Sequence, residues 1–238
     1  MSAKSNSRTH IHDHFAELSQ RSPACRPVYD RAESMTSLRP WRVVNSTRTY
    51  EDPWLKVRSD RCMTPEGIEV HPYHVLEYPD WVNVVPLLDD AGTLLMVREY
   101  RHGIGEIMLG LAGGNVEPEE TVLEAAARRE LIEETGYGSG VLTPILTSTP
   151  NSATQSNRVT SFIATDVERL RSPELDTTEM IETVIADLPE LMLGIRDGTV
   201  SLQVMHVAAL WAATGHVLAG RCPGHDRLRQ RLRNTLFG

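Results

Sequence analysis

The chain has 238 residues, with 24 Lys and Arg against 32 Asp and Glu, so its formal net charge is −8 and its pI is about 5.6. This acidic balance argues against a general nucleic-acid binder, because affinity for the phosphate backbone needs clustered cations. A hydrophobic content of 40% is enough for a packed core in one or two domains. We therefore expect a globular protein without a nucleic-acid partner.

Membrane and disulfide signals are missing from the sequence. No stretch reaches the roughly 20 apolar residues of a spanning helix, and the N-terminus has no apolar signal core. The three cysteines, Cys25, Cys62 and Cys222, are odd in number, far apart and outside any CxxC pattern. This usage fits free thiols in a reducing compartment. We expect a cytoplasmic protein without a membrane partner, a disulfide or a zinc ribbon.

The first 40 residues form a polar segment that is interrupted by Pro23, Pro27 and Pro40. Such a composition predicts a flexible N-terminal arm over residues 1–40. Its tract of alternating histidines, His10 to His14, is more typical of an adventitious polar tail than of a transition-metal site.

Four β-type segments follow, and turns between them predict two hairpins. These segments are residues 54–63, 68–77, 81–88 and 93–100.

The second half of the chain contains both strand and helix signals. A glycine-rich stretch, 103–114, leads into the strongest helix pattern, 121–135. Two strands and two further helices are expected after it. They are residues 141–148 and 159–165, then 188–196 and 201–218. We assign 41–218 to the main domain and 219–238 to a basic C-terminal tail. The tail is compatible with a short amphipathic helix, and its composition is more typical of a solvated end than of a partner or phosphate contact.

The ends of the helix at 121–135 carry recognisable signals. Thr121-x-x-Glu124 has the spacing of a capping box, which would place the N-cap at Thr121. Gly136 follows the last helical residue and is expected to stop the helix. The helix should therefore be about 14 residues long.

Three glutamates gather on one face of this helix. At 100° per residue, Glu130, Glu133 and Glu134 fall within an arc of roughly 100°. They repel one another by roughly 0.2–0.5 kcal/mol per pair, and their place near the C-terminus also opposes the helix dipole. Arg129 can offset one charge by pairing with Glu133. Hard divalent cations, which prefer oxygen ligands, would offset all three, whereas a solvated glutamate-rich helix end needs no cation.

The residues around this helix resemble a known signature. The pattern G-x5-E-x7-R-E-U-x-E-E-x-G-U, with U bulky and apolar, is the box of the Nudix hydrolases, and the segment from Arg129 to Tyr137 matches every fixed position of its second half. The spacing from Gly114 to Glu120 also fits, but eight residues rather than seven separate Glu120 from Arg129. Either a loop absorbs the extra residue, as the capping box favours, or Thr121 takes the position of the first glutamate.

Two further elements are similar to those of ADP-ribose pyrophosphatase-like Nudix enzymes. Residues 97–102 resemble their E-x-Y-R element, and 109–114 resemble E-L-P-A-G-G, although Leu109-Gly110-Leu111 stands where Glu-Leu-Pro is usual. Pro150 is the candidate for a proline that usually follows the box. The resemblance covers roughly residues 41–215.

The resemblance implies a fold and an activity. The fold would be an α/β/α Nudix sandwich with a mixed sheet and an N-terminal β extension, 41–77, that contributes to a homodimer. The reaction would be hydrolysis of ADP-ribose to AMP and ribose 5-phosphate with Mg2+ or Mn2+. Another nucleotide sugar, a dinucleotide or a dinucleoside polyphosphate are alternative small-molecule substrates. A nucleotide-sensing module without turnover is the alternative from another class.

The resemblance also implies roles for single residues. The metal ligands would be Glu130, Glu133, Glu134 and the carbonyl of Ala112, and Arg129 would orient the glutamates. Arg101, whose guanidinium suits bidentate oxygen recognition, and Glu106 would bind substrate. The general base would be a loop glutamate, with Glu179 as first choice and Glu182 as second, although Thr177 aligns best with the position of the base in relatives.

Overall fold

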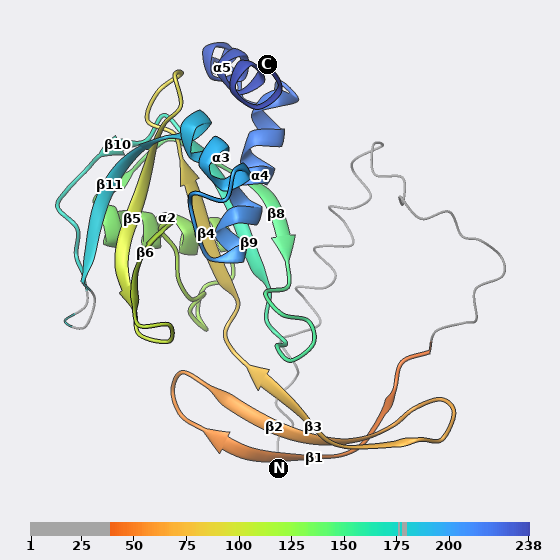
Figure 1. Ribbon diagram of the computed structural model, residues 1–238. Helices are drawn as coiled ribbons and strands as arrows, with labels where there is room; N and C mark the ends of the chain where they lie inside the picture. Colours follow the sequence, from red (N-terminus) through yellow and green to blue (C-terminus); the bar gives the residue numbers. More distant parts are fainter. Residues whose placement is uncertain (1–38, 176, 178–179) are drawn as a thin grey trace. The chain divides into compact units, whose positions relative to one another are not determined.

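The computed structural model describes residues 39–175, 177 and 180–238 (Figure 1). The expected N-terminal arm, apart from its last two residues, lies outside the described residues, as do its histidine tract, Cys25 and Glu179. In the described part, no helix has the length and apolar character needed to cross a membrane. Cys62 and Cys222 are buried free thiols, as expected for these two.

The first described element is a three-stranded antiparallel sheet. Its strands are β1 (Arg42–Glu51), β2 (Lys56–Met63) and β3 (Glu69–Glu77), in the order β1-β2-β3. The expected hairpin of 54–63 with 68–77 is confirmed, and its turn uses Gly67 at φ +82°, a conformation that favours glycine. Strand β1 lies within the expected β extension, 41–77, but was not among the four β-type segments predicted from the residue pattern. Every one of its residues is exposed, so its sequence lacks the alternation that marks a half-buried strand.

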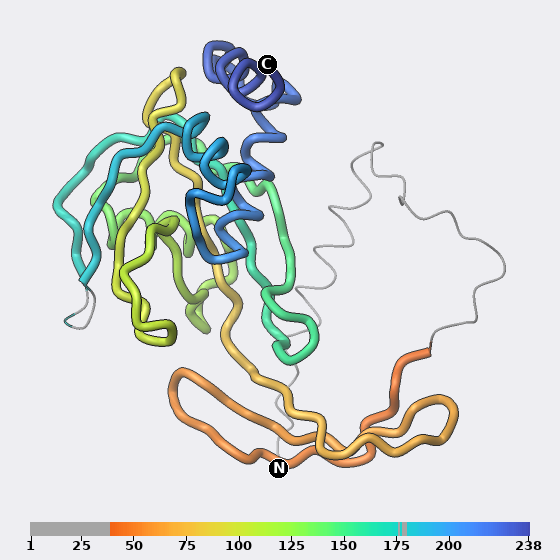
Figure 2. The backbone as a smooth tube through the Cα atoms, viewed as in Figure 1, coloured from red at the N-terminus to blue at the C-terminus, as the bar shows by residue number. Residues whose placement is uncertain are grey.

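Two further three-stranded sheets form the centre of residues 77–238 (Figure 1), and Figure 2 traces the path of the chain through them. In the first, β9 lies between β4, to which it is parallel, and β8, to which it is antiparallel. In the second, β5 lies between β11 and β6 and is antiparallel to both. The strands are β4 (Trp81–Pro86), β5 (Thr93–Arg101), β6 (Glu106–Gly110), β8 (Val141–Ser148), β9 (Val159–Thr165) and β11 (Ile181–Asp187), with the short pair β7 (Tyr137–Gly138) and β10 (Glu168–Arg169) beside them.

The second expected hairpin, 81–88 with 93–100, is largely wrong. Only an isolated bridge between Leu87 and Leu94 joins β4 and β5, and the two strands then enter different sheets. Residues 82–86 are all buried, so β4 is covered on both faces. A strand of that kind fits the interior beside a parallel neighbour, here β9.

Helices cover the sheets on two sides, which gives the expected α/β/α arrangement (Figure 1). They are α2 (Leu123–Thr135), α3 (Leu188–Arg196), α4 (Val204–Leu218) and α5 (Asp226–Phe237). Val84 packs in one buried cluster with Ala126 and Leu131 of α2. Its neighbour Val85 packs in the other cluster, which contains residues of α3, α4 and α5. Because successive strand residues point to opposite faces, the two clusters lie on opposite sides of β4.

The C-terminal residues form part of the core rather than a solvated tail. Helix α5 places Leu228, Leu232 and Leu236 at four-residue spacing on one face, and all three are buried in the cluster that also contains α3 and α4. The arginines between them lie on its outer side, where Arg231 donates hydrogen bonds to Asp187 and to the carbonyl of Ala91. The basic residues of 219–238 therefore cover an amphipathic helix that belongs to the fold.

The predicted capping box of α2 is wrong, whereas its predicted end is confirmed. The helix begins at Leu123, and its N-cap, Val122, makes no side-chain capping bond. Thr121 falls one residue before the cap, and Glu124 pairs with Arg128 at 3.1 Å instead of reaching back to the helix start. At the other end Gly136 adopts the left-handed conformation with φ 75°.

Candidate active site

The guanidinium of Arg129 is the centre of a hydrogen-bonded cluster at the box. Its Nε and Nη2 donate to the two carboxylate oxygens of Glu120 at 3.0 and 3.1 Å. Its Nη1 donates to Glu130 Oε1 and Glu133 Oε2, both at 2.9 Å, and Nη2 also donates to the carbonyl of Asn115 at 3.0 Å. An arginine has five N–H donors, and these contacts use all five. Arg129 therefore orients glutamates and has no donor left for a substrate.

The same contacts set the charge state of Glu120. Its hydrogen bond from Arg129 lowers the pKa of the Glu120 carboxyl below its usual value, and this outweighs partial burial, which acts in the opposite direction. The hydrogen bond to Glu120 in turn raises the pKa of Arg129. Both groups are therefore charged at neutral pH, as an ion pair that is one-sixth to one-quarter exposed.

Two other carboxylates rest on the glycines before the helix. Glu134 is 8% exposed and its Oε2 accepts the N–H of Gly113 at 3.1 Å. A Cβ at Gly114 would lie 2.6 Å from the Oε1 of Glu130, and one at Gly113 would lie 2.2 Å from the carbonyl oxygen of Val82. A side chain at Gly113 would clash with backbone, and one at Gly114 would displace the carboxylate of Glu130. The Gly113-Gly114 pair therefore allows α2 to bring Glu130 and Glu134 directly onto the backbone.

The extra residue in the box is absorbed before the helix, as expected. Residues 117–120 form a turn in which the N–H of Glu120 donates to the carbonyl of Glu117 at 3.0 Å. The N–H of Glu117 in turn donates to the side chain of Glu120 at 2.9 Å. Glu120 thus lies outside α2, yet its carboxylate still reaches Arg129 nine residues later. Glu120 and Arg129 therefore form an ion pair although Glu120 lies outside the helix.

The expected metal ligands are partly assembled by these contacts. Glu130, Glu133 and Glu134 lie near the end of one helix, and two of them are bonded to Arg129. The carbonyl of Ala112 accepts the N–H of Val84 at 3.0 Å, which occupies one of its two lone pairs. As they stand, no three His, Cys, Asp or Glu side chains of the described residues converge as a metal site. The donors are all oxygens, however, and this chemistry fits a hard divalent cation.

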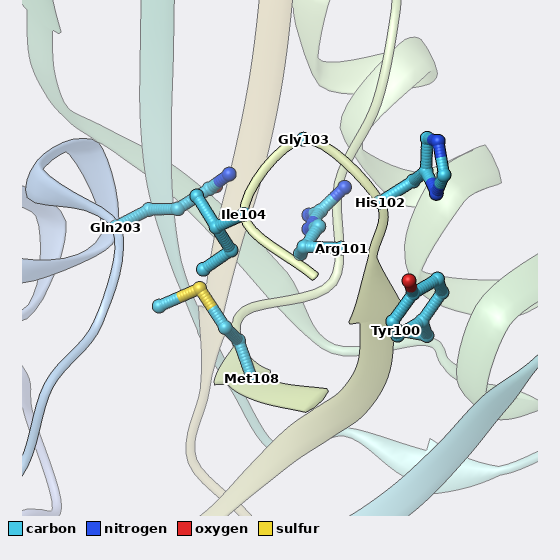
Figure 3. Close-up of a pocket in the computed structure, with 7 residues that line it drawn as sticks. All are labelled: Tyr100, Arg101, His102, Gly103, Ile104, Met108 and Gln203. Carbon is cyan, nitrogen blue, oxygen red and sulfur yellow. The ribbon is translucent and has the colours of Figure 1, made fainter. Parts of the chain in front are cut away.

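A pocket of about 560 Å³ opens beside the β5–β6 hairpin (Figure 3). Arg101, predicted to bind substrate, lines it, and its Nη2 lies 2.5 Å from Glu99 Oε1. Glu106 faces Arg101 across the hairpin register but is exposed and is not among the lining residues. The lining residues are Tyr100, Arg101, His102, Gly103, Ile104, Met108 and Gln203.

Gln203 was not predicted as a site residue. It is the N-cap of α4 and lies about a hundred residues beyond the hairpin in sequence. Figure 3 shows its side chain reaching from the loop before α4, with Ile104 between it and Arg101. No local signal marks such a residue, because only the packing of α4 brings it to the hairpin.

The candidate general bases lie in or beside the segment before β11. Glu179 is outside the described residues, and Thr177 is exposed in a turn. Glu182 on β11 accepts hydrogen bonds from the Nε and Nη2 of Arg98. Its neighbour Ile181 packs against the α2 cluster, so Glu182 points away from α2 and its glutamates. The second choice for the base is therefore on the wrong face of β11.

Two family descriptions match consecutive parts of the chain. The description "NUDIX domain" matches residues 77–200. The description "Nucleoside diphosphate sugar hydrolase N-terminal domain" matches residues 41–76, which contain β1–β3. The boundary between the two matches coincides with the end of β3.

Individual proteins are similar to the same region. The ADP compounds hydrolase NudE of Escherichia coli is 32% identical over 113 residues, covering 47% of this chain and 59% of NudE. The ADP-ribose pyrophosphatase of Bacillus subtilis is 29% identical over 119 residues, covering 50% and 63% of the two chains. The chain thus spans about three-fifths of the length of these two relatives. A crystal structure of an ADP compounds hydrolase matches with a TM-score of 0.67 and 27% identity, covering 79% of this chain and 98% of that one.

Proposed function

Because the chain belongs to the Nudix family, we propose that it hydrolyses the diphosphate bond of a nucleoside diphosphate linked to a second group. ADP-ribose is the first substrate, with AMP and ribose 5-phosphate as products. The observation that carries the proposal is the cluster in which Arg129 holds Glu120, Glu130 and Glu133 beside the Gly113-Gly114 turn. Similarity to proteins named for ADP compounds and for ADP-ribose supports the choice of substrate.

The proposed cofactor is Mg2+ or Mn2+. Glu130, Glu133 and Glu134 would hold it, together with the lone pair of the Ala112 carbonyl that Val84 leaves available. When bound, a divalent cation neutralises the diphosphate and lowers the pKa of a bound water. Arg129 keeps the carboxylates of Glu130 and Glu133 oriented while Glu120 balances its charge.

The pocket beside the hairpin is proposed to receive the substrate. Arg101 presents a guanidinium that matches a phosphate or ribose oxygen pair, and its contact with Glu99 fixes its direction. Ile104 and Met108 supply apolar contacts and Gln203 supplies an amide for the remaining part of the ligand. Glu106 remains a proposed substrate contact at the open end of the hairpin.

The proposed general base is Glu179. The described residues on either side of its segment contact both halves of the site. The N–H of Glu174 donates to the carbonyl of Glu133 at 2.8 Å, and Ile181 is paired with Glu99 on β5. The described residues Glu174 and Ile181 therefore contact the end of α2 and the end of β5, respectively. The carboxylate of Glu179 would accept the proton of the attacking water.

A nucleotide panel tests the proposal directly. The purified protein is assayed with Mg2+ against ADP-ribose, other nucleotide sugars, dinucleotides and dinucleoside polyphosphates, and the phosphomonoester products are measured through a coupled phosphatase. We expect ADP-ribose to be hydrolysed at least as well as diadenosine compounds. A preference of tenfold or more for nucleoside triphosphates or diadenosine compounds would contradict the substrate, though not the family.

Dependence on a metal is tested in the same assay. Activity should disappear in EDTA and return when Mg2+ or Mn2+ is added in excess, because the carboxylate cluster alone cannot neutralise a diphosphate. Full turnover in the chelator would contradict the proposed cofactor. The control is the coupling enzyme assayed alone under the same conditions.

The name of the Escherichia coli relative, ADP compounds hydrolase, favours a candidate function with a broader range of substrates. A hydrolase of several ADP compounds would use the same cluster and differ only in what the pocket admits. A nucleotide-sensing module without turnover would instead bind ADP-ribose with no hydrolysis in the panel. The presence of all three box glutamates argues for turnover.

We also propose that the protein is a homodimer through the sheet β1–β3. This sheet carries several exposed apolar side chains on its strands and turns, which a second copy of the chain would cover. They include Val43, Val44, Tyr50, Trp54 and Ile68.

A further inference from the structure

The first turn of α4 lies against the end of β6. Gln203 caps this helix, and its carbonyl accepts the N–H of His206 at 2.9 Å. Gln203 faces the pocket, whereas His206, one turn later, is only 4% exposed. The turn therefore presents one polar side chain to the pocket and buries the next beneath it. No role described above uses His206.

The imidazole of His206 packs directly on the backbone that follows β6. Its Nδ1 accepts the N–H of Leu111 at 3.4 Å. A Cβ built at Gly110 would lie 3.0 Å from the Cε1 of His206 and 3.1 Å from its Nδ1, so the ring occupies the space of a side chain at that position. Because an N–H points at Nδ1, this nitrogen carries no proton and the ring is the neutral Nε2–H form.

This contact holds one end of the turn that carries the carboxylates. Leu111 is 1% exposed, so water cannot replace His206 as the partner of its N–H. The next three residues are Ala112 to Gly114. The N–H groups of Val84 and Val82 donate to the carbonyls of Ala112 and Gly114, respectively. Glu134 then bonds the N–H of Gly113 on the other side. Between β6 and this turn, the side chain of His206 holds the backbone through its hydrogen bond with the N–H of Leu111.

We propose that His206 is a positioning residue of the active site, which fixes Gly110-Leu111 and thereby the Ala112–Gly114 turn on which Glu130 and Glu134 rest. It touches neither substrate nor metal and acts only through this backbone. The inference rests on the proposed function for its kinetic consequence, while its structural consequence does not need turnover. Residues that orient the immediate surroundings of a metal typically alter affinity or activity by roughly 10–100-fold.

The surrounding charges are consistent with a neutral ring. Burial lowers the pKa of His206 to about 4, and the positive charge of Arg101 acts in the same direction. The ring therefore keeps its acceptor over the whole range in which the protein would act. An acceptor at this position is what the N–H of Leu111 requires.

Two substitutions separate the acceptor from the volume of the ring. His206→Leu replaces the imidazole by an apolar side chain and so removes the acceptor. His206→Gln instead supplies an amide oxygen as acceptor. We expect His206→Leu to lower kcat for ADP-ribose by roughly 10–100-fold with KM changed less than threefold. His206→Gln should recover most of the loss. Equal loss in both variants, or a normal kcat in folded His206→Leu, would overturn the proposal.

A control on the same helix tests whether any change in α4 has this effect. Thr214 is 1% exposed, and its hydroxyl has no hydrogen-bond partner among the described residues. Thr214→Val changes a buried polar side chain two turns from His206 without removing a contact to the active-site backbone. Its kcat should match the unaltered protein. A loss as large as in His206→Leu would show a merely structural effect.

A measurement without substrate keeps the inference distinct from the proposed function. The melting temperature is recorded with and without Mn2+, and the Mn2+ concentration at half of the shift is compared. We expect it to rise roughly 10–100-fold in His206→Leu and to stay near the original in His206→Gln. If no nucleotide is hydrolysed but this difference appears, the proposed function fails and the positioning role stands. An unchanged Mn2+ dependence in His206→Leu overturns the positioning role.

Discussion

Two glutamates of the box are held in different ways, and this difference predicts different effects when each is replaced. Glu134 lies on α2, and its carboxylate accepts the N–H of Gly113 in the turn before the helix. Glu120 lies in the preceding loop, and both of its carboxylate oxygens accept hydrogen bonds from Arg129. Replacing each by glutamine keeps its size and one oxygen acceptor. The two variants therefore test charge alone.

Glu134→Gln should lose at least about a thousandfold in turnover. A ligand charge that acts in each step would be missing, and each factor of ten corresponds to about 1.36 kcal/mol of transition-state stabilisation. The glutamine oxygen can still accept the N–H of Gly113, and repulsion with Glu130 one turn earlier is relieved. The melting temperature without metal should therefore stay constant or rise. Turnover within tenfold of the original protein would refute the role of Glu134.

Glu120→Gln should reduce turnover less than tenfold and destabilise the fold by about 1 kcal/mol, the order expected for a partly exposed ion pair. Since the pKa of Glu120 is lowered in the folded state, its contribution is present above the ordinary carboxyl pKa and is lost as the pH falls below it. Urea unfolding at pH 7 and pH 3 measures this difference. Glu124→Gln is the control, because that residue pairs with Arg128 in an exposed position. An inactive but stably folded Glu120→Gln protein would show that the loop residue does more than support Arg129.

His206 should make the fold sensitive to mild acid. Its pKa is about 4 in the folded protein because of burial and of Arg101, against about 6.5 for an ordinary histidine. Between these values the unfolded chain binds more protons, so stability is full above pH 6.5 and declines as the pH falls to 4, by about 3 kcal/mol at most. His206→Gln should flatten the unfolding free energy over this range.

At the scale of elements, the burial of α5 differs from the solvated end that its composition favoured. Leu232→Ala should destabilise the protein by about 2–5 kcal/mol, because the side chain is fully buried in the core shared with α3 and α4. Arg233→Ala, on the exposed face of the same helix, should change stability by less than about 0.5 kcal/mol. Chemical unfolding of both variants compares the two faces directly. Equal small effects would mean that α5 is not part of the folding unit.

The strands show which elements the local pattern can predict. The expected ranges of β8, β9 and α3 are those observed, and the start of α3 has a local cause, since Asp187 caps it and Pro189 follows. Strand β6 was hidden in a glycine-rich stretch, and β11 carries several exposed residues. Their partners on β5 determine that they are strands. Pairing between distant segments has no counterpart in a local window.

For the whole molecule, we expect a dimer at micromolar concentration in analytical ultracentrifugation. Val44→Lys places a charge on a β1 side chain that is 44% exposed and should shift the protein to monomer without unfolding it. Thr183→Lys, at an exposed position of β11 outside this sheet, is the matched control and should remain dimeric. A monomer at every concentration for the unaltered chain would contradict the proposed assembly.

The sequence by itself determined the helix of the box, its glycine stop and the chemistry of its carboxylates, because a period of 3.6 residues places Glu130, Glu133 and Glu134 together without reference to any other segment. Only the tertiary structure decided that Glu120 reaches Arg129 across the inserted residue, that Glu182 faces away from α2, and that His206 bonds Leu111 from 95 residues away. These contacts join segments whose distance along the chain carries no spatial information. They arise when buried apolar faces pack and the remaining buried polar groups must find partners.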